Sequence, residues 1–123
     1  MLAASILILR VGDVLIATMQ MELKDTVVDA FQQEILKAIQ VTEAKGLIID
    51  ISTVLMVDTY TARVLIRTSK MAKLLGTETV LAGVKPEIAA TLVRMGFLLP
   101  EIKTALDLEE GLQLLGVIPK KAA

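Results

Sequence analysis

The sequence predicts an α/β fold in a single domain, with a mixed, mostly parallel sheet of four to five strands and about four helices. Short runs of β-branched and aliphatic residues alternate along the chain with segments of helical hydrophobic spacing. Such alternation builds strand-helix-strand units, in which right-handed crossovers place the strands parallel. The length of 123 residues suits one domain with its own core. We expect this domain over residues 1–117, followed by a short C-terminal tail over residues 118–123.

The N-terminal part of the chain predicts a hairpin followed by a helix. The β-rich runs Ser5–Leu9 and Val14–Met19 flank the turn signal Arg10–Asp13, which indicates an antiparallel hairpin. From Asp25 onward, apolar residues recur at helical spacing until about Lys45-Gly46. The residues that share this helix face are Val27, Val28, Phe31, Ile35 and Ile39.

The middle of the chain predicts a central strand and a second helix. The run Leu47–Ile51 is short, β-branched and almost wholly apolar, as expected of a strand buried on both faces. The stretch Met56–Leu65 then opens a helix that should end at Leu75-Gly76, because glycine favours the C-terminal cap.

The C-terminal part predicts two further strands, each followed by a helix. Thr79–Ala82 forms a fourth strand, and Pro86 stands at the first position of a helix that should end before Gly96. Ile102–Ala105 forms a short last strand, and Asp107-Leu108-Glu109-Glu110 has the spacing of a capping box at the start of a last helix. The predicted order is β-β-α-β-α-β-α-β-α.

The composition excludes much of catalytic chemistry. The chain has no cysteine and no histidine, which removes disulfides, thiolate metal sites, cysteine nucleophiles and imidazole bases. Its 13 basic and 14 acidic residues give a net charge of −1, and only 2% of its residues are aromatic. The chain therefore has neither the basic field nor the stacking side chains that a nucleic-acid partner requires.

The sequence also predicts a soluble protein of the cytoplasm with no membrane partner. The apolar run Met1–Leu9 has no preceding basic region and no cleavage signal, so we expect a strand there rather than a signal peptide. No uncharged run approaches the ~20 residues that span a bilayer. Hydrophobic residues make up 54% of the chain, above the usual share, and this surplus is compatible with contacts to other chains.

Two carboxylates and one glycine are the candidates for catalytic or nucleotide-binding chemistry. Asp50 and Asp58 could in principle act as acid and base or hold Mg²⁺. The structural alternative, which we favour, is that Asp50 accepts hydrogen bonds at a strand end while Asp58 caps a helix. Gly83 stands at a strand-helix junction, but one glycine is a weak signal for a phosphate-binding loop. We therefore expect no enzyme, no cofactor and no metal.

Thr59 is the residue of the stretch Met56–Leu65 that structure alone does not explain. Asp58 is accounted for as an N-cap, worth about 1 kcal/mol. On a helical wheel, Thr59 heads a solvent-facing basic stripe made of Arg63, Arg67 and Lys70. The same wheel puts five residues on the core side: Tyr60, Val64, Thr68, Met71 and Leu75.

The wheel places Ile66 near the middle of the exposed face, flanked by Ala62 and Lys73. Single exposed apolar residues are ordinary, but one within a basic stripe beneath an exposed hydroxyl also suits a docking surface. A kinase would add about −1.5 to −2 charge at Thr59. Arg63 and the helix N-terminus would partly offset that charge, and a partner that docks an acidic or apolar surface there would be repelled.

Two long stretches of the sequence follow the pattern of a known family. The run L-I-I-D-I-S-T-V-L-M-V-D-T-Y-T-A-R-V-L, Leu47–Leu65, has a strand ending in Asp and then a D-S/T pair that opens a helix. The run T-V-L-A-G-V-K-P-E-I-A-A-T-L-V-R-M-G, Thr79–Gly96, has a strand, a turn and a Pro-initiated helix. Both resemble STAS domains, the fold of anti-sigma-factor antagonists, and the resemblance covers nearly the whole chain.

Within that family, the sequence is most similar to the RsbS-type scaffolds of the bacterial stressosome. The similarity lies in the opening S-I-L-I-L-R-V-G-D-V-L-I, the helix entrance M-E-L-K-D and the ending T-A-L-D-L-E-E-G-L. It implies a non-enzymatic switch, in which the unphosphorylated scaffold holds an RsbT-type serine/threonine kinase and phosphorylation releases it. It also implies self-association with RsbR-type paralogues in a large hollow particle.

The resemblance places the phosphoacceptor at Thr59, which follows Asp58 where the RsbS type usually has Ser. Asp58, Arg63, Ile66 and Arg67 are then the cap and partner surface beside it. The secondary acceptors would be Ser52, Thr53 and Thr61. Two alternatives remain open: a free anti-sigma-factor antagonist of the same fold, favoured less because Thr61-Ala62 replaces the glycine common in simple antagonists, and a small enzyme or nucleotide-binding domain.

Overall fold

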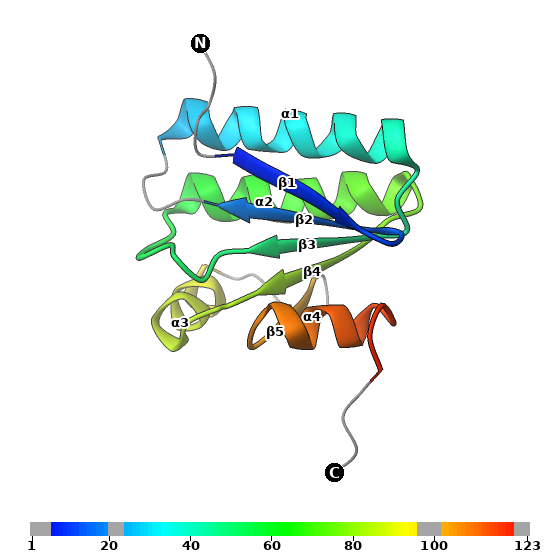
Figure 1. Ribbon diagram of the computed structural model, residues 1–123. Coiled ribbons are helices and arrows are strands. Elements are labelled where there is room, and N and C mark those ends of the chain that lie inside the picture. The colour runs from blue at the N-terminus through cyan, green and yellow to red at the C-terminus, as the bar shows by residue number, and fades with distance from the viewer. Residues whose placement is uncertain (1–5, 20–23, 96–101, 120–123) are drawn as a thin grey trace.

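The computed structural model describes residues 6–19, 24–95 and 102–119, and its elements follow the predicted order (Figure 1). The strands are β1 (Ile6–Val11), β2 (Val14–Met19), β3 (Gly46–Asp50), β4 (Glu78–Ala82) and β5 (Lys103–Ala105). The helices are α1 (Asp25–Thr42), α2 (Thr59–Leu74), α3 (Pro86–Arg94) and α4 (Leu108–Leu114). The predicted boundaries at Ser5 and Gly96, part of the M-E-L-K-D entrance and the tail beyond residue 119 lie outside the described residues.

The five strands form one mixed sheet in the order β1-β2-β3-β4-β5. β1 pairs antiparallel with β2, as the turn signal predicted, and the other three pairs are parallel. Gly12 closes the hairpin with a φ of 58°, a conformation that glycine adopts without steric cost. The mixed, mostly parallel sheet of the prediction is confirmed.

The sheet separates two hydrophobic clusters. The larger cluster joins one face of the sheet to α1, α2 and α3, through residues such as Phe31, Leu65 and Ile88. The smaller cluster joins the opposite face to α4 and its C-cap, through Leu108, Leu112 and the C-cap residue Leu115. Leu47, Ile48 and Ile49 of β3 have no exposed surface, which confirms that this strand is central and buried on both faces.

Three helix ends show how local chemistry sets the boundaries. α1 stops at Thr42, before the expected Lys45-Gly46, because Glu43 takes a left-handed conformation with a φ of 54° and its N–H bonds the carbonyl of Ile39. α2 ends as predicted, followed by Gly76 with a φ of 86°. Before α4, the Asp107 carboxylate accepts from the N–H of Glu110 at 2.9 Å, which is one half of the predicted capping box. In the other half, the Glu110 carboxylate accepts from the N–H of Leu106 instead of the N–H of Asp107.

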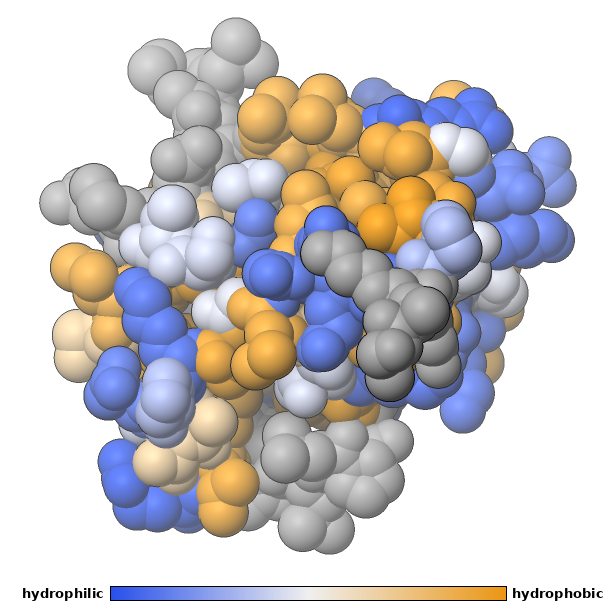
Figure 2. All heavy atoms as spheres, turned by 60° about the horizontal axis from the view of Figure 1, so that its bottom comes forward, coloured by the Kyte–Doolittle hydropathy of each residue, from blue (hydrophilic) through white to orange (hydrophobic). Residues whose placement is uncertain are grey.

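One face of the sheet is only partly covered. Leu7, Leu9 and Val11 of β1 are 49%, 52% and 39% exposed. Leu9 and Val11 pair with Ile16 and Val14 of β2, which belong to the cluster beneath α4, so they lie on that same face. Figure 2 shows this side of the molecule, where apolar side chains gather into a patch that polar residues border. We call Leu7, Leu9 and Val11 the β1 patch.

Candidate functional site

The candidate site begins in the loop between β3 and α2, which several hydrogen bonds hold in place. Asp50 accepts from the N–H of Ser52 at 2.9 Å, as the structural alternative for this carboxylate predicted. The Thr53 hydroxyl donates to the carbonyl of Met19 at 3.1 Å, and the Lys85 ammonium donates to the carbonyl of Val54 at 3.4 Å. The loop therefore presents the start of α2 in a defined position.

Apolar residues of this loop divide between core and surface. Val54 and Val57 are 0% and 5% exposed, whereas Leu55 and Met56 between them are 72% and 78% exposed. Burying the two valines anchors the loop to the main cluster. Leu55 and Met56 are left as an exposed apolar pair directly before Asp58 and Thr59.

Asp58 caps α2, as predicted. Its backbone is extended, with φ −84° and ψ 175°, and its carboxylate accepts from the N–H of Thr61 at 2.8 Å. Thr59 is then the first residue of the helix, and its side chain is exposed. Within the described part of the chain, no hydrogen bond engages the Thr59 hydroxyl. This hydroxyl is accessible and has no structural task.

The basic stripe on α2 is exposed as predicted, at Arg63, Arg67 and Lys70. The prediction for Ile66 is wrong, because Ile66 is 9% exposed and Ala62 is fully buried, both in the main cluster. Ile66 therefore packs in the core and is no part of a partner surface.

Three residues assigned to the core side of α2 are exposed instead. Tyr60, Met71 and Leu75 are 37%, 41% and 44% exposed, while Val64 and Thr68 are buried as predicted. The helix had two apolar arcs on the wheel, and the arc that packs on the sheet centres on Leu65 and Ala72. The predicted core direction was therefore rotated by roughly a quarter turn.

Tyr60 connects the start of α2 to α1. Its phenol donates a hydrogen bond to the Asp29 carboxylate. This hydrogen bond is the main reason that the pKa of Tyr60 lies above 10.0, and desolvation and the Asp29 charge act in the same direction. No sequence pattern predicts this contact, because the partners are 31 residues apart.

The other candidate hydroxyls are less suited to modification. Thr61 is 1% exposed, so a kinase cannot reach it in the folded protein. Ser52 and Thr53 are exposed, but the Thr53 hydroxyl already donates a hydrogen bond to the carbonyl of Met19. Thr59 is the hydroxyl that combines exposure with a helix N-terminus.

Gly83 has a structural explanation. Its φ is 76°, and a Cβ built on it would lie 2.7 Å from the Cβ of Ser52 and 2.9 Å from the Ser52 backbone. Glycine is needed there because the loops after β3 and β4 touch. Among the residues that the structure describes, no group of three or more acidic side chains could hold a metal ion, and no helix is long and apolar enough to cross a membrane.

Residues 5–111 match the model of the STAS domain. The chain belongs to the STAS domain family. It is similar to a single-residue variant of RsbS from Moorella thermoacetica, with 42% identity, a TM-score of 0.82, and coverage of 90% of this chain and 94% of that one. It is also similar, at 41% identity and a TM-score of 0.76, to a chain in the structure of the stressosome, described as a signal integration and transduction hub, covering 89% and 95% of the two chains.

Two curated relatives are similar to part of this chain. It is 35% identical over 81 residues to the RsbT co-antagonist protein RsbRA of Bacillus subtilis, covering 66% of this chain and 30% of that protein. It is also 35% identical to RsbRD of the same organism, covering 65% and 29%. The chain thus spans less than a third of these two relatives. The anti-sigma factor antagonist SpoIIAA, at 16% identity and a TM-score of 0.76, shares the fold.

Proposed function

We propose that this protein is a non-enzymatic scaffold of a cytoplasmic stressosome, which sequesters an RsbT-type serine/threonine kinase and releases it when Thr59 is phosphorylated. The observation that carries the proposal is Thr59 itself, an exposed hydroxyl without a structural task at the first position of α2. The similarity to RsbS at 42% identity supports the same pathway.

The local electrostatics allow Thr59 to work as a switch. A phosphate adds about −1.5 to −2 charge, which the helix N-terminus and the guanidinium of Arg63, one turn further on, partly balance. The Asp58 carboxylate already accepts from the N–H of Thr61. It therefore remains the cap of α2, while its negative charge repels the phosphate. The fold survives the modification, while the charge of the surface around Thr59 changes from basic to acidic.

The kinase-binding surface extends on both sides of Thr59. Leu55 and Met56 supply exposed apolar area before it, and Arg63 and Arg67 supply positive charge after it. Apolar anchors bordered by charge are typical of protein interfaces. A new phosphate at the centre of this surface would have to be desolvated on binding, which weakens the complex.

The β1 patch suits the second part of the proposal, co-assembly with RsbR-type paralogues and further copies of this chain. An exposed apolar face of this kind marks an interaction site. The relatives RsbRA and RsbRD carry a segment that aligns with this chain. The patch lies on the sheet face that α4 leaves partly open, away from α2.

The test is a phosphotransfer assay with the protein, its candidate kinase and ATP, followed by mass spectrometry. We expect one phosphate on the peptide that contains Thr59, none on Thr59→Ala, and undiminished transfer to Thr61→Ala, because Thr61 is buried. We further expect Thr59→Glu to bind the kinase more weakly than the parent protein. Undiminished transfer to Thr59→Ala would refute the acceptor assignment.

A further inference from the structure

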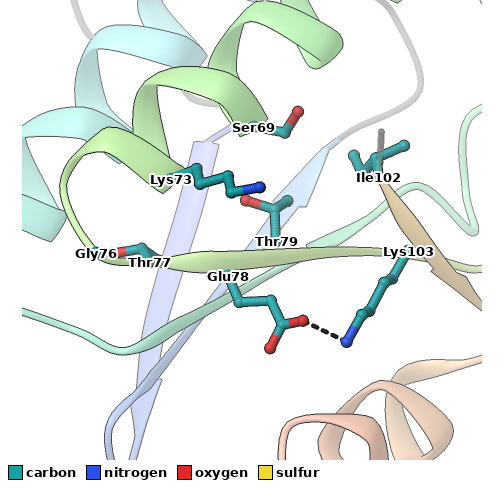
Figure 3. Close-up of a pocket in the computed structure, with 8 residues that line it drawn as sticks. All are labelled: Ser69, Lys73, Gly76, Thr77, Glu78, Thr79, Ile102 and Lys103. Atoms are coloured by element: carbon teal, nitrogen blue, oxygen red, sulfur yellow. Dashed lines mark ion pairs between the residues drawn. The ribbon is translucent and has the colours of Figure 1, made fainter. Parts of the chain in front are cut away.

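A pocket of about 400 Å³ opens where α2 ends and β4 begins (Figure 3). It lies beside the start of the last strand. β5 starts at Lys103, opposite Val80, so the first two residues of β4, Glu78 and Thr79, extend beyond the described part of β5. The volume is at the lower end of the range for small-molecule sites, about 300–1,000 Å³, and far above the roughly 30 Å³ of one water.

Thr79 is the group in this pocket that lacks an explanation. It is 7% exposed, and its hydroxyl oxygen has no hydrogen-bond partner in the described structure. The neighbouring hydroxyls are satisfied, since Ser69 donates to Ile66 and Thr77 donates to Ala44, each at 2.7 Å. Buried polar groups in folded proteins are nearly always paired, so this unpartnered hydroxyl is a hydrogen-bonding group that a ligand in the pocket can engage.

Lys73 supplies the charge. It lies in the last turn of α2, and Figure 3 shows its ammonium and the Thr79 hydroxyl pointing toward one another. The other ammonium of the lining, Lys103, pairs with Glu78. Two backbone carbonyls at this end of α2 also have partners, because the carbonyl of Ala72 accepts from the N–H of Thr77 and the carbonyl of Lys73 accepts from the N–H of Gly76. The pocket therefore offers two donors, one of them charged, while the carboxylate in its lining, Glu78, is paired with Lys103.

We propose that this pocket binds a small molecule through an oxyanion, which accepts hydrogen bonds from the Lys73 ammonium and the Thr79 hydroxyl. Charge-assisted hydrogen bonds of this kind suit carboxylate and phosphate oxygens. Ile102, which is 6% exposed, gives the pocket an apolar wall, so a short carbon chain fits behind the anionic group. The site is separate from Thr59, which lies at the opposite end of α2.

The experiment is a ¹H–¹⁵N correlation titration of the labelled full chain with three probes: inorganic phosphate, acetate and butyrate, each at constant ionic strength balanced with chloride. We expect saturable shifts at the amides of Ser69, Gly76, Thr77 and Thr79. Tighter binding of butyrate than of acetate would assign an organic acid, and tighter binding of phosphate would assign a phosphorylated compound or free phosphate.

Two variants separate binding from folding. Lys73→Gln and Thr79→Val should each weaken binding of the preferred probe by about tenfold, while Thr79→Val keeps or raises the melting temperature, because it removes an unpaired buried hydroxyl. Lys37→Gln, an exposed lysine on α1, is the matched control and should bind as the parent does. Linear, unsaturable shifts with all three probes, or equal affinity in Lys73→Gln and Lys37→Gln, would overturn the proposal.

Discussion

At the scale of single residues, the candidate site divides into positions fixed by local sequence and positions fixed by packing. Asp58 and Thr59 follow from their neighbours, because a cap and the first helical residue are set within one turn. Tyr60 follows from the approach of α1 to α2, and its hydrogen bond to Asp29 has no local signature. Sequence reasoning therefore located the hydroxyl and its cap but assigned Tyr60 to the wrong environment.

Tyr60 can be observed by itself, because it is the one tyrosine of a chain without tryptophan. Its pKa is raised by the hydrogen bond to Asp29, so a titration of tyrosinate absorbance should have its midpoint above that of the chain in urea. The hydrogen bond contributes stability at pH values below the unfolded pKa, and this contribution is lost as the pH rises through the folded pKa.

Asp29→Asn should lower the pKa of Tyr60 towards 10.0 by removing the charged acceptor, and Asp25→Asn should have a smaller effect, since Asp25 acts only through its charge. Identical midpoints for the folded and the urea-unfolded chain would disprove the Tyr60–Asp29 contact.

At the scale of elements, periodicity predicted the order and type of the nine strands and helices in the described part of the chain, because apolar patterns and start or stop residues mark them. It did not predict which arc of α2 faces the sheet. Apolar residues occupy two arcs of this helix, and packing against α1 and the sheet decides between them. For this reason Ile66, which was predicted to be exposed, is buried, and Met71, which was predicted to be buried, is exposed.

The Asp58 cap should contribute to stability independently of any signalling role. Asp58→Ala removes the acceptor for the Thr61 N–H and should lower the free energy of unfolding by about 1 kcal/mol in urea denaturation. Lys24→Ala is the matched control, because Lys24 is the N-cap of α1 without a side-chain hydrogen bond. Equal stability losses in the two variants would mean that the carboxylate does not cap α2.

Gly83 ties β4 to the loop after β3. Gly83→Ala combines a φ of 76° with a Cβ placed 2.7 Å from Ser52, so its free energy of unfolding should fall by more than about 1 kcal/mol. Gly12→Ala is the control for the backbone alone, because its φ is 58° and a Cβ there meets nothing within 4 Å. A loss no larger than that of Gly12→Ala would show that the loops move apart freely.

At the scale of the whole molecule, the two faces of the sheet are covered unequally. Three helices pack on one face and the short α4 packs on the other, so the β1 patch stays exposed. Neither the patch nor the pocket at Thr79 could be predicted from the sequence, because an apolar strand gives no information on what covers it.

The β1 patch predicts how assembly should fail. Leu9→Glu puts a charge where the proposed contact needs apolar area, so light scattering of a mixture with an RsbR-type paralogue should lose the large particle. Folding should be little affected, since Leu9 is already 52% exposed. Val41→Glu is the control, because Val41 lies on α1 and is 75% exposed. If the parent protein itself stays a monomer or dimer in the mixture, the free antagonist function is favoured instead.

The unequal covering of the sheet also separates two tasks in space. The β1 patch lies on the α4 side, and Thr59 begins a helix on the other side. In the proposed assembly, a subunit that is held in the particle through its β1 patch keeps the Thr59 hydroxyl accessible to a kinase. Phosphorylation of Thr59 then takes place on the intact particle. It changes whether the kinase is bound, while the contacts between subunits remain in place.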